Sequence, residues 1–166
     1  MIADYQFFAG AGSLLFPSDV DIYISPRTGK IKEVRQGGFH LASLNPKSGF
    51  FSLSIEGAKK IVRKRGSPVV VIKNNIISEV SGGGNVFAKH ISDAESRLRA
   101  GDEAIVVSED SSLVAVGRSL LGGDEAKGFK RGVAIKVRRG VDCRYAKQKN
   151  GPEGNAPSNG KNGCQT

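Results

Sequence analysis

The sequence predicts a mainly β protein of the α+β class, with a small α+β module followed by a small β-barrel that carries short helices. Short segments rich in branched residues recur along the chain, and runs of turn-forming residues separate them. Glycine provides 22 of the 166 residues and tryptophan is absent, which suits short strands joined by tight turns. A helical bundle is therefore not expected.

The first module is predicted to span residues 1–67 and to begin with two hairpins. Each hairpin follows from a turn-forming run between apolar segments, the first at Pro26–Gly29 and the second at Asn45–Gly49. The predicted strands are residues 20–24, 31–34, 39–44 and 50–53.

A helix is predicted over residues 54–65, where the apolar period changes. Ser54 can cap this helix, and Gly66 and Pro68 stop it, so we place the module boundary near residue 67. Its polar side and end carry the densest basic run of the chain, which comprises Lys59, Lys60, Arg63, Lys64 and Arg65. Such a run is usually a solvated helix face. Five like charges without an interleaved acid are better explained by a polyanionic partner.

The second module is predicted to span residues 68–146. Its short, closely spaced strands are typical of a small barrel. The predicted strands are residues 69–72, 86–91, 104–107, 113–116 and 133–137. A short helical stretch, residues 75–80, follows the first strand, and residues 109–112 join the third and fourth strands as a hairpin.

A glycine-rich loop, Ser81–Asn85, precedes the predicted strand 86–91. Glycine allows backbone N–H groups to approach a phosphate, although a flexible connector would have the same composition. The loop matches neither a P-loop nor a dinucleotide-binding fingerprint. Alternation along the following strand places Phe87 and Lys89 on one face and His90 on the other. We interpret His40 and His90 as structural, not catalytic.

The chain is strongly basic, with 25 Lys and Arg against 16 Asp and Glu and a net charge of +9. A basic surface attracts nucleic acid or anionic lipid, and RNA or DNA is the leading class of partner. No apolar run is long enough to cross a membrane, and the N-terminus lacks the order of a signal peptide. A cytoplasmic protein without membrane association is expected.

Residues 147–166 consist mainly of Gly, Pro, Asn, Ser and Lys, and we expect them to form a flexible tail. Cys143 and Cys164 are too few for a disulfide framework. Together with the two histidines they do not give the spacing of a zinc site, so no metal is expected.

The second half resembles the PUA domain, the small barrel named for pseudouridine synthases and archaeosine transglycosylases. The matching segments are residues 69–71, 84–90, 99–103, 113–118 and 130–138. The resemblance implies that the glycine loop, its adjoining strand and the last strand border an RNA groove. Alternation along that last strand places Lys136 and Arg138 on one face. The residues expected to bind RNA are Gly83, Gly84, Asn85, Phe87, Lys89, Arg118, Lys130, Arg131, Lys136 and Arg138, joined by Lys59, Lys60, Arg63 and Lys64 of the predicted helix.

The first half looks like the pre-PUA module of archaeal tRNA-guanine transglycosylases. The matching segments are residues 3–7, 27–31, 49–53 and 56–58. That family carries its chemistry on a TIM barrel of about 250 residues, which 166 residues cannot hold beside the two modules. The resemblance therefore implies a noncatalytic chain without a cofactor.

The leading hypothesis is a noncatalytic RNA-binding protein that recognises structured RNA, with the tRNA acceptor stem and 3′ end as its expected target. The alternative is a detached tRNA-docking subunit of an archaeosine transglycosylase whose catalytic barrel lies on another chain. That alternative predicts an apolar surface patch on the first module. An independent enzyme would need a constellation of carboxylates or a nucleophile that the sequence does not show.

Overall fold

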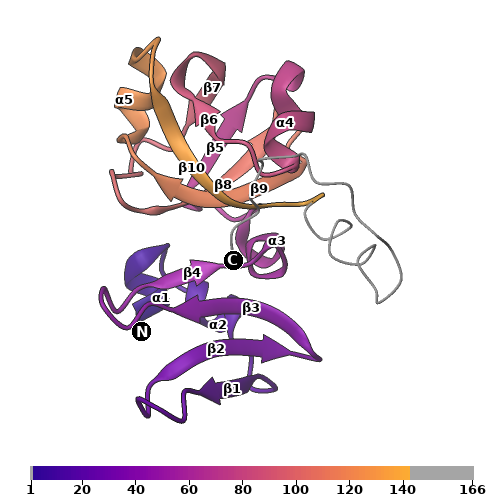
Figure 1. The fold of residues 1–166 in the computed structure, drawn as a ribbon, viewed down its shortest axis with the longest axis vertical. Helices are drawn as coiled ribbons and strands as arrows, with labels where there is room; N and C mark the ends of the chain where they lie inside the picture. Colours follow the sequence, from indigo (N-terminus) through magenta and orange to yellow (C-terminus); the bar gives the residue numbers. More distant parts are fainter. Residues whose placement is uncertain (1, 143–166) are drawn as a thin grey trace, which may run out of the picture.

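The computed structural model describes residues 2–142, and it shows two parts stacked on one another, each built on its own sheet (Figure 1). We call them the N-terminal unit and the barrel. The predictions for Cys143, Cys164 and the tail from residue 147 fall outside the described residues.

The N-terminal unit contains a four-stranded antiparallel sheet in the order β1-β2-β3-β4. Its strands are β1 (Asp21–Ile24), β2 (Ile31–Gln36), β3 (Phe39–Leu44) and β4 (Phe51–Leu53), and its helices are α1 (Ile2–Gln6), α2 (Ala11–Leu15) and α3 (Ile55–Ile61). Both predicted hairpins are present. The short helices α1 and α2 carry no strong helical period, and the sequence analysis did not predict them.

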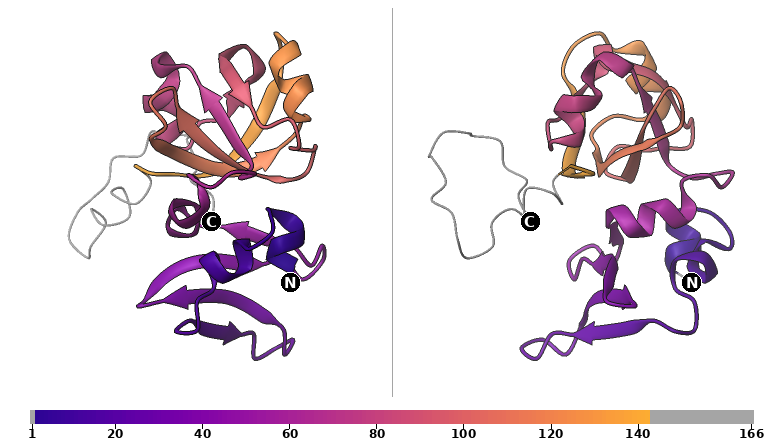
Figure 2. Two further views of the ribbon diagram at one scale, coloured as in Figure 1. Left: turned by 180° about the vertical axis from the view of Figure 1, so that it is seen from behind. Right: turned by 90° about the vertical axis from the view of Figure 1, so that its right-hand side faces the viewer.

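Helix α3 lies between the two sheets, where it packs against β3 and β9 (Figures 1 and 2). It begins where predicted, because the Ser54 hydroxyl accepts the Gly57 N–H at 3.1 Å. The helix ends at Ile61, four residues earlier than predicted. The Ser67 hydroxyl donates to the Ile61 carbonyl, and the chain then turns through Gly66 at a φ of +88°.

The barrel is a six-stranded sheet in the order β6-β10-β9-β8-β5-β7, with β5 and β8 parallel and the other pairs antiparallel. Its strands are β5 (Val69–Ile72), β6 (Val86–Phe87), β7 (Ile91–Ala94), β8 (Glu103–Ser108), β9 (Leu113–Ser119) and β10 (Val133–Gly140). Its helical segments are η1 (Asn74–Ile76), α4 (Ile77–Ser81), η2 (Ala88–His90) and α5 (Gly123–Gly128).

The single strand predicted over residues 86–91 is wrong. The segment contains β6, the helical turn η2 and the start of β7, and these two strands form opposite edges of the sheet. Three residues span at most about 10 Å, so the two edges must lie close together. The sheet therefore curls into a nearly closed barrel, as the sequence predicts. Because η2 interrupts the strand, the expected alternation of Phe87, Lys89 and His90 does not hold.

The two parts share an apolar core in addition to the core inside the barrel. Strand β8 is buried along its whole length, with Ala104 and Val106 facing into the barrel. Ile105 faces outward and packs with Ile55 and Ile61 of the N-terminal unit. The continuous apolar run of β8 thus reflects a strand covered on both sides. The sheets remain separate although their packing is shared, and the boundary near residue 67 stays a prediction.

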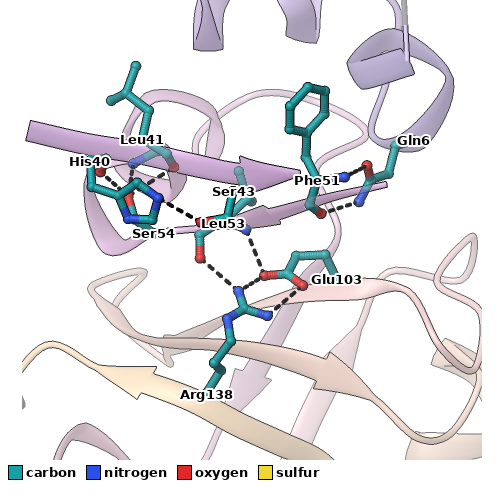
Figure 3. Close-up of polar contacts among 10 residues, drawn as sticks. Gln6, His40, Leu41, Ser43, Phe51, Leu53, Ser54, Glu103 and Arg138 are labelled. Atoms are coloured by element: carbon teal, nitrogen blue, oxygen red, sulfur yellow. Dashed lines mark hydrogen bonds and ion pairs between the residues drawn. The ribbon is translucent and has the colours of Figure 1, made fainter. Parts of the chain in front are cut away.

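Polar contacts reinforce this shared packing (Figure 3). Glu103 of β8 accepts the Leu53 N–H at 2.9 Å, and Arg138 of β10 donates to the Leu53 carbonyl at 2.7 Å. Arg138 also makes two hydrogen bonds to the Glu103 carboxylate, one of 3.0 Å. One buried ion pair therefore joins two barrel strands to β4. None of the helices among the described residues is long and apolar enough to span a membrane.

Candidate nucleic-acid interface

The glycine loop caps helix α4. The Gly84 N–H donates to the Glu79 carbonyl at 2.9 Å, and the Gly83 N–H donates to the Val80 carbonyl at 3.0 Å. With Gly83 at a φ of +107°, this is a Schellman motif, which explains the glycine at that position. These two N–H groups are already bonded within the fold, so they are not free to bind a phosphate as the sequence analysis expected.

Gly84 is required by packing. A Cβ at this position would lie 2.8 Å from Glu79 Cγ and 2.9 Å from the Glu79 carbonyl oxygen. Substitution of Gly84 would therefore disturb the end of α4, which makes the residue a poor probe of RNA binding.

Side chains next to the loop form an exposed surface. The Asn85 side chain accepts the Val137 N–H at 3.1 Å, which ties the loop to β10. Phe87 pairs with Val133 and is 40% exposed. Lys89 in η2, and Lys130 and Arg131 just before β10, are also exposed. We call Asn85, Phe87, Lys89, Lys130 and Arg131 the glycine-loop surface.

A row of charges crosses the outer face of the barrel. The strand register places Glu103 opposite Arg118, and Arg118 opposite Lys136. Arg138 adds a third cation, since it binds the Glu103 carboxylate. Arg118 and Lys136 are both exposed, and neither forms an ion pair with any residue of the described range. The row therefore carries more positive charge than its single carboxylate can balance.

Arg138 has a structural role that the sequence analysis did not predict. Arg138 binds Glu103 on the outer face of the barrel, so it shares that face with Lys136 as expected from alternation; the bulge lies between Val137 and Arg139. The Glu103 side chain is 6% exposed, against 33% for Arg138. Burial raises the pKa of the Glu103 carboxyl, and the Arg138 guanidinium counteracts part of that rise. Because its guanidinium is held by Glu103 and Leu53, we leave Arg138 out of the proposed RNA contacts.

The basic run around α3 forms a third region. Lys59 forms an ion pair with Glu56 at 3.2 Å, and Lys60 donates to the Gln36 side chain. Arg63 and Lys64 are exposed in the turns after the helix. Figures 1 and 2 place α3 between the sheets, away from α4 and the glycine loop. The structure thus does not bring this run together with the glycine-loop surface.

A groove of about 940 Å³ lies between the N-terminal unit and the barrel. Its lining includes Arg118 and Arg138, which the sequence analysis selected, and Tyr5, Arg97 and Arg99, which it missed. The missed residues come from α1 and from the segment between β7 and β8. No local pattern brings these segments together, so the packing of the two parts was needed to identify them.

The side chains that commonly bind metal ions are not clustered in the described part of the chain. No group of three or more His, Cys, Asp or Glu side chains within residues 2–142 could hold a metal ion. The His40 ring lies 2.9 Å from the Ser43 hydroxyl, and burial lowers the pKa of its imidazole. The structural interpretation of His40 stays a prediction.

Family models match both parts of the chain. The patch-forming domain C2 of tRNA-guanine transglycosylase matches residues 1–68, and the PUA domain matches residues 68–141. The chain therefore carries a PUA domain, preceded by a domain that matches the C2 domain of tRNA-guanine transglycosylase. The predicted resemblance to the C-terminal region of archaeal tRNA-guanine transglycosylases is confirmed.

The tRNA-guanine(15) transglycosylase of Thermococcus kodakarensis is 38% identical over 143 residues, which cover 85% of this chain and 24% of the relative. The enzyme of the same name from Methanothermobacter thermautotrophicus is 38% identical over 84% of this chain and 22% of the relative. The chain thus spans about a quarter of the length of these curated relatives.

Solved structures show the same fold. A hypothetical protein from Pyrococcus horikoshii superposes with a TM-score of 0.61 at 17% identity, covering 84% of this chain and 86% of the other. A PUA domain from Aeropyrum pernix gives a TM-score of 0.59 at 13% identity, covering 76% and 72%. At these identities the similarity concerns the fold alone.

Proposed function

We propose that this chain is a noncatalytic RNA-binding protein that recognises structured RNA, with tRNA around its acceptor stem and 3′ end as the target. The observation that carries the proposal is the pair Arg118 and Lys136, two cations opposite one another on neighbouring strands. Like charges in this position repel each other. A phosphate backbone lying along the strands would relieve the repulsion and release its counterions.

The comparisons support tRNA as the RNA. The relatives are tRNA-guanine(15) transglycosylases, which act on tRNA, and this chain matches them across both of its parts. It covers less than a quarter of their length, so we carry over binding and not their chemistry. A-form RNA is recognised largely through its shape, phosphates and 2′-hydroxyls, for which a row of exposed cations is suited.

Filter binding with intact tRNA and with tRNA trimmed of its unpaired 3′ end tests the target. Arg131→Ala should weaken binding of intact tRNA roughly tenfold to a hundredfold, because a charge-assisted hydrogen bond contributes about 1.5–3 kcal/mol. Its effect on trimmed tRNA should be smaller, since we place the 3′ end at the glycine-loop surface. Lys60→Ala should weaken both RNAs equally.

Lys30→Ala, an exposed position in the turn between β1 and β2, serves as the charge-matched control and should change neither affinity. Equal loss of both RNAs in Arg131→Ala would contradict recognition of the 3′ end. Failure of the unaltered protein to bind tRNA would contradict the function itself.

One observation favours the second candidate, a docking subunit that works with a separate catalytic chain. Strand β1 is an edge strand exposed on both faces, and it presents Ile22 and Ile24 at 54% and 58% exposure. Ile31, which pairs with Ile24, and Phe39 of β3 are also exposed. An exposed apolar edge strand is a ready pairing site for another chain. These exposed apolar side chains support the second candidate.

Affinity purification of the tagged chain from its native cells distinguishes the candidates. A docking subunit should recover a transglycosylase catalytic chain in stoichiometric amount after nuclease treatment, and Ile24→Asp should abolish that recovery. Recovery of tRNA without such a chain would support the independent RNA-binding protein.

A further inference from the structure

We infer that the groove between the N-terminal unit and the barrel binds an unpaired stretch of RNA, with one base stacked on Tyr5 and its phosphates held by arginines. The inference rests on the proposed function and adds a contact surface separate from the glycine-loop surface. Exposed aromatic rings line one side of the groove and arginines line the other. This combination is the one that binds single-stranded nucleic acid.

The N-terminal unit supplies the exposed aromatic rings that line the groove. Tyr5 is 84% exposed and lies on α1. Its neighbour Gln6 fixes that helix to β4, because the Gln6 side chain exchanges two hydrogen bonds of 2.7 Å with the Phe51 backbone (Figure 3). Phe50, 44% exposed, also lines the groove, just before β4. Two exposed rings in a groove offer a stacking surface that the fold does not use for its own packing.

The basic side comes from two elements. Arg97 and Arg99 belong to the loop between β7 and β8, and Arg118 belongs to β9. The Gly101 N–H of the loop donates to the Ser119 carbonyl at 2.7 Å, which fixes the loop to the end of β9. A Cβ on Gly101 would lie 3.3 Å from a guanidinium nitrogen of Arg118, so glycine leaves room for that side chain.

The acidic groups of the lining are already used within the fold. Asp4 accepts the backbone N–H of Gly12 at 2.8 Å, and Asp102 accepts the backbone N–H of Arg99 at 2.9 Å. Glu103 is bound by Arg138. By contrast, Arg97, Arg99 and Arg118 form no ion pair with any residue between 2 and 142. The groove therefore presents these guanidinium groups to an incoming anion.

The geometry favours an unpaired strand over a duplex or an acidic peptide. A duplex keeps its base faces stacked inside, so only an unpaired nucleotide can place a base on Tyr5. The groove volume of about 940 Å³ lies at the upper end of the range of about 300–1,000 Å³ for sites that enclose small ligands. An acidic peptide would use the arginines but would leave the flat aromatic side without a partner.

Fluorescence anisotropy with a labelled six-nucleotide single-stranded RNA tests the inference. Tyr5→Ala should weaken binding roughly fivefold to a hundredfold, the equivalent of about 1–3 kcal/mol for one stacked base. Arg99→Ala should weaken binding and lower the slope of log affinity against log salt by about 0.7, the value for one phosphate contact of a single strand. A blunt-ended RNA duplex, which has no unpaired nucleotide, should bind both variants as it binds the unaltered protein.

Matched controls lie in the β1–β2 hairpin. Tyr23→Ala removes the other described exposed tyrosine, and Arg27→Ala removes an exposed arginine. Both variants should bind the hexanucleotide like the unaltered protein, and thermal melts should confirm that all four variants fold. Equal effects of Tyr5→Ala and Tyr23→Ala, or competition by polyglutamate as strong as by RNA, would overturn the inference.

Binding of intact tRNA without binding of the hexanucleotide would also overturn the groove inference, while leaving the proposed function in place. If the unaltered protein bound neither RNA, the proposed function would fail, and the groove inference would fail with it.

Discussion

Replacing Arg138 by methionine is expected to lower the free energy of unfolding by about 3–5 kcal/mol, because it leaves the buried Glu103 carboxylate without its partner. A value near the lower end is expected, since a third of the Arg138 side chain is exposed. Urea unfolding followed by circular dichroism measures the change. Arg139→Met, the neighbouring arginine without an ion pair in the described part of the chain, should stay within about 0.5 kcal/mol.

The defect of Arg138→Met should depend on pH. Burial holds the folded-state pKa of Glu103 above its ordinary value of 4.5, and loss of Arg138 raises it further. The folded variant then binds a proton more tightly than its unfolded chain, so its stability rises as the pH falls toward 4.5. The deficit should therefore shrink in acid. A loss below about 1 kcal/mol at neutral pH would show that the pair contributes little to joining the two parts.

Affinity for tRNA is expected to fall roughly a hundredfold or more when salt is raised from about 50 to 200 mM, because each neutralised phosphate releases counterions. The double variant Arg118→Ala/Lys136→Ala should reduce the slope of log affinity against log salt by about 1.4–1.8, the value for two contacts. The comparison variant Lys30→Ala/Lys32→Ala removes the same charge from the β1–β2 hairpin and should leave the slope unchanged. A slope independent of Arg118 and Lys136 would contradict their proposed role.

Local pattern predicted most of the fold because each hairpin is encoded by its own strands and turn. Where the pattern failed, a contact made from outside the predicted element was responsible. The helix from Ser54 stops early because Ser67 binds its last carbonyl. The strand predicted over residues 86–91 breaks because barrel closure requires a turn between two edges of the sheet. Neither effect is visible in a window of a few residues.

The candidate site likewise contains some residues that the sequence could identify and others that only the structure brings together. The sequence was sufficient to identify a basic cluster in the last strand and in the residues just before it. Its members Lys130, Arg131 and Lys136 are exposed in the structure. The structural role of Arg138 depends on Glu103, 35 residues away in sequence. Tyr5 meets the arginines of the groove only through the packing of the N-terminal unit on the barrel.

Ultraviolet cross-linking of tRNA to the purified chain, followed by mass spectrometry of the linked peptides, tests the central claim most directly. The account predicts cross-links in the peptides that carry Arg118 and Lys136, on the outer face of β9 and β10, and in the segments that line the groove. Cross-links confined to the β1–β2 hairpin, or their absence from every peptide between residues 2 and 142, would contradict it.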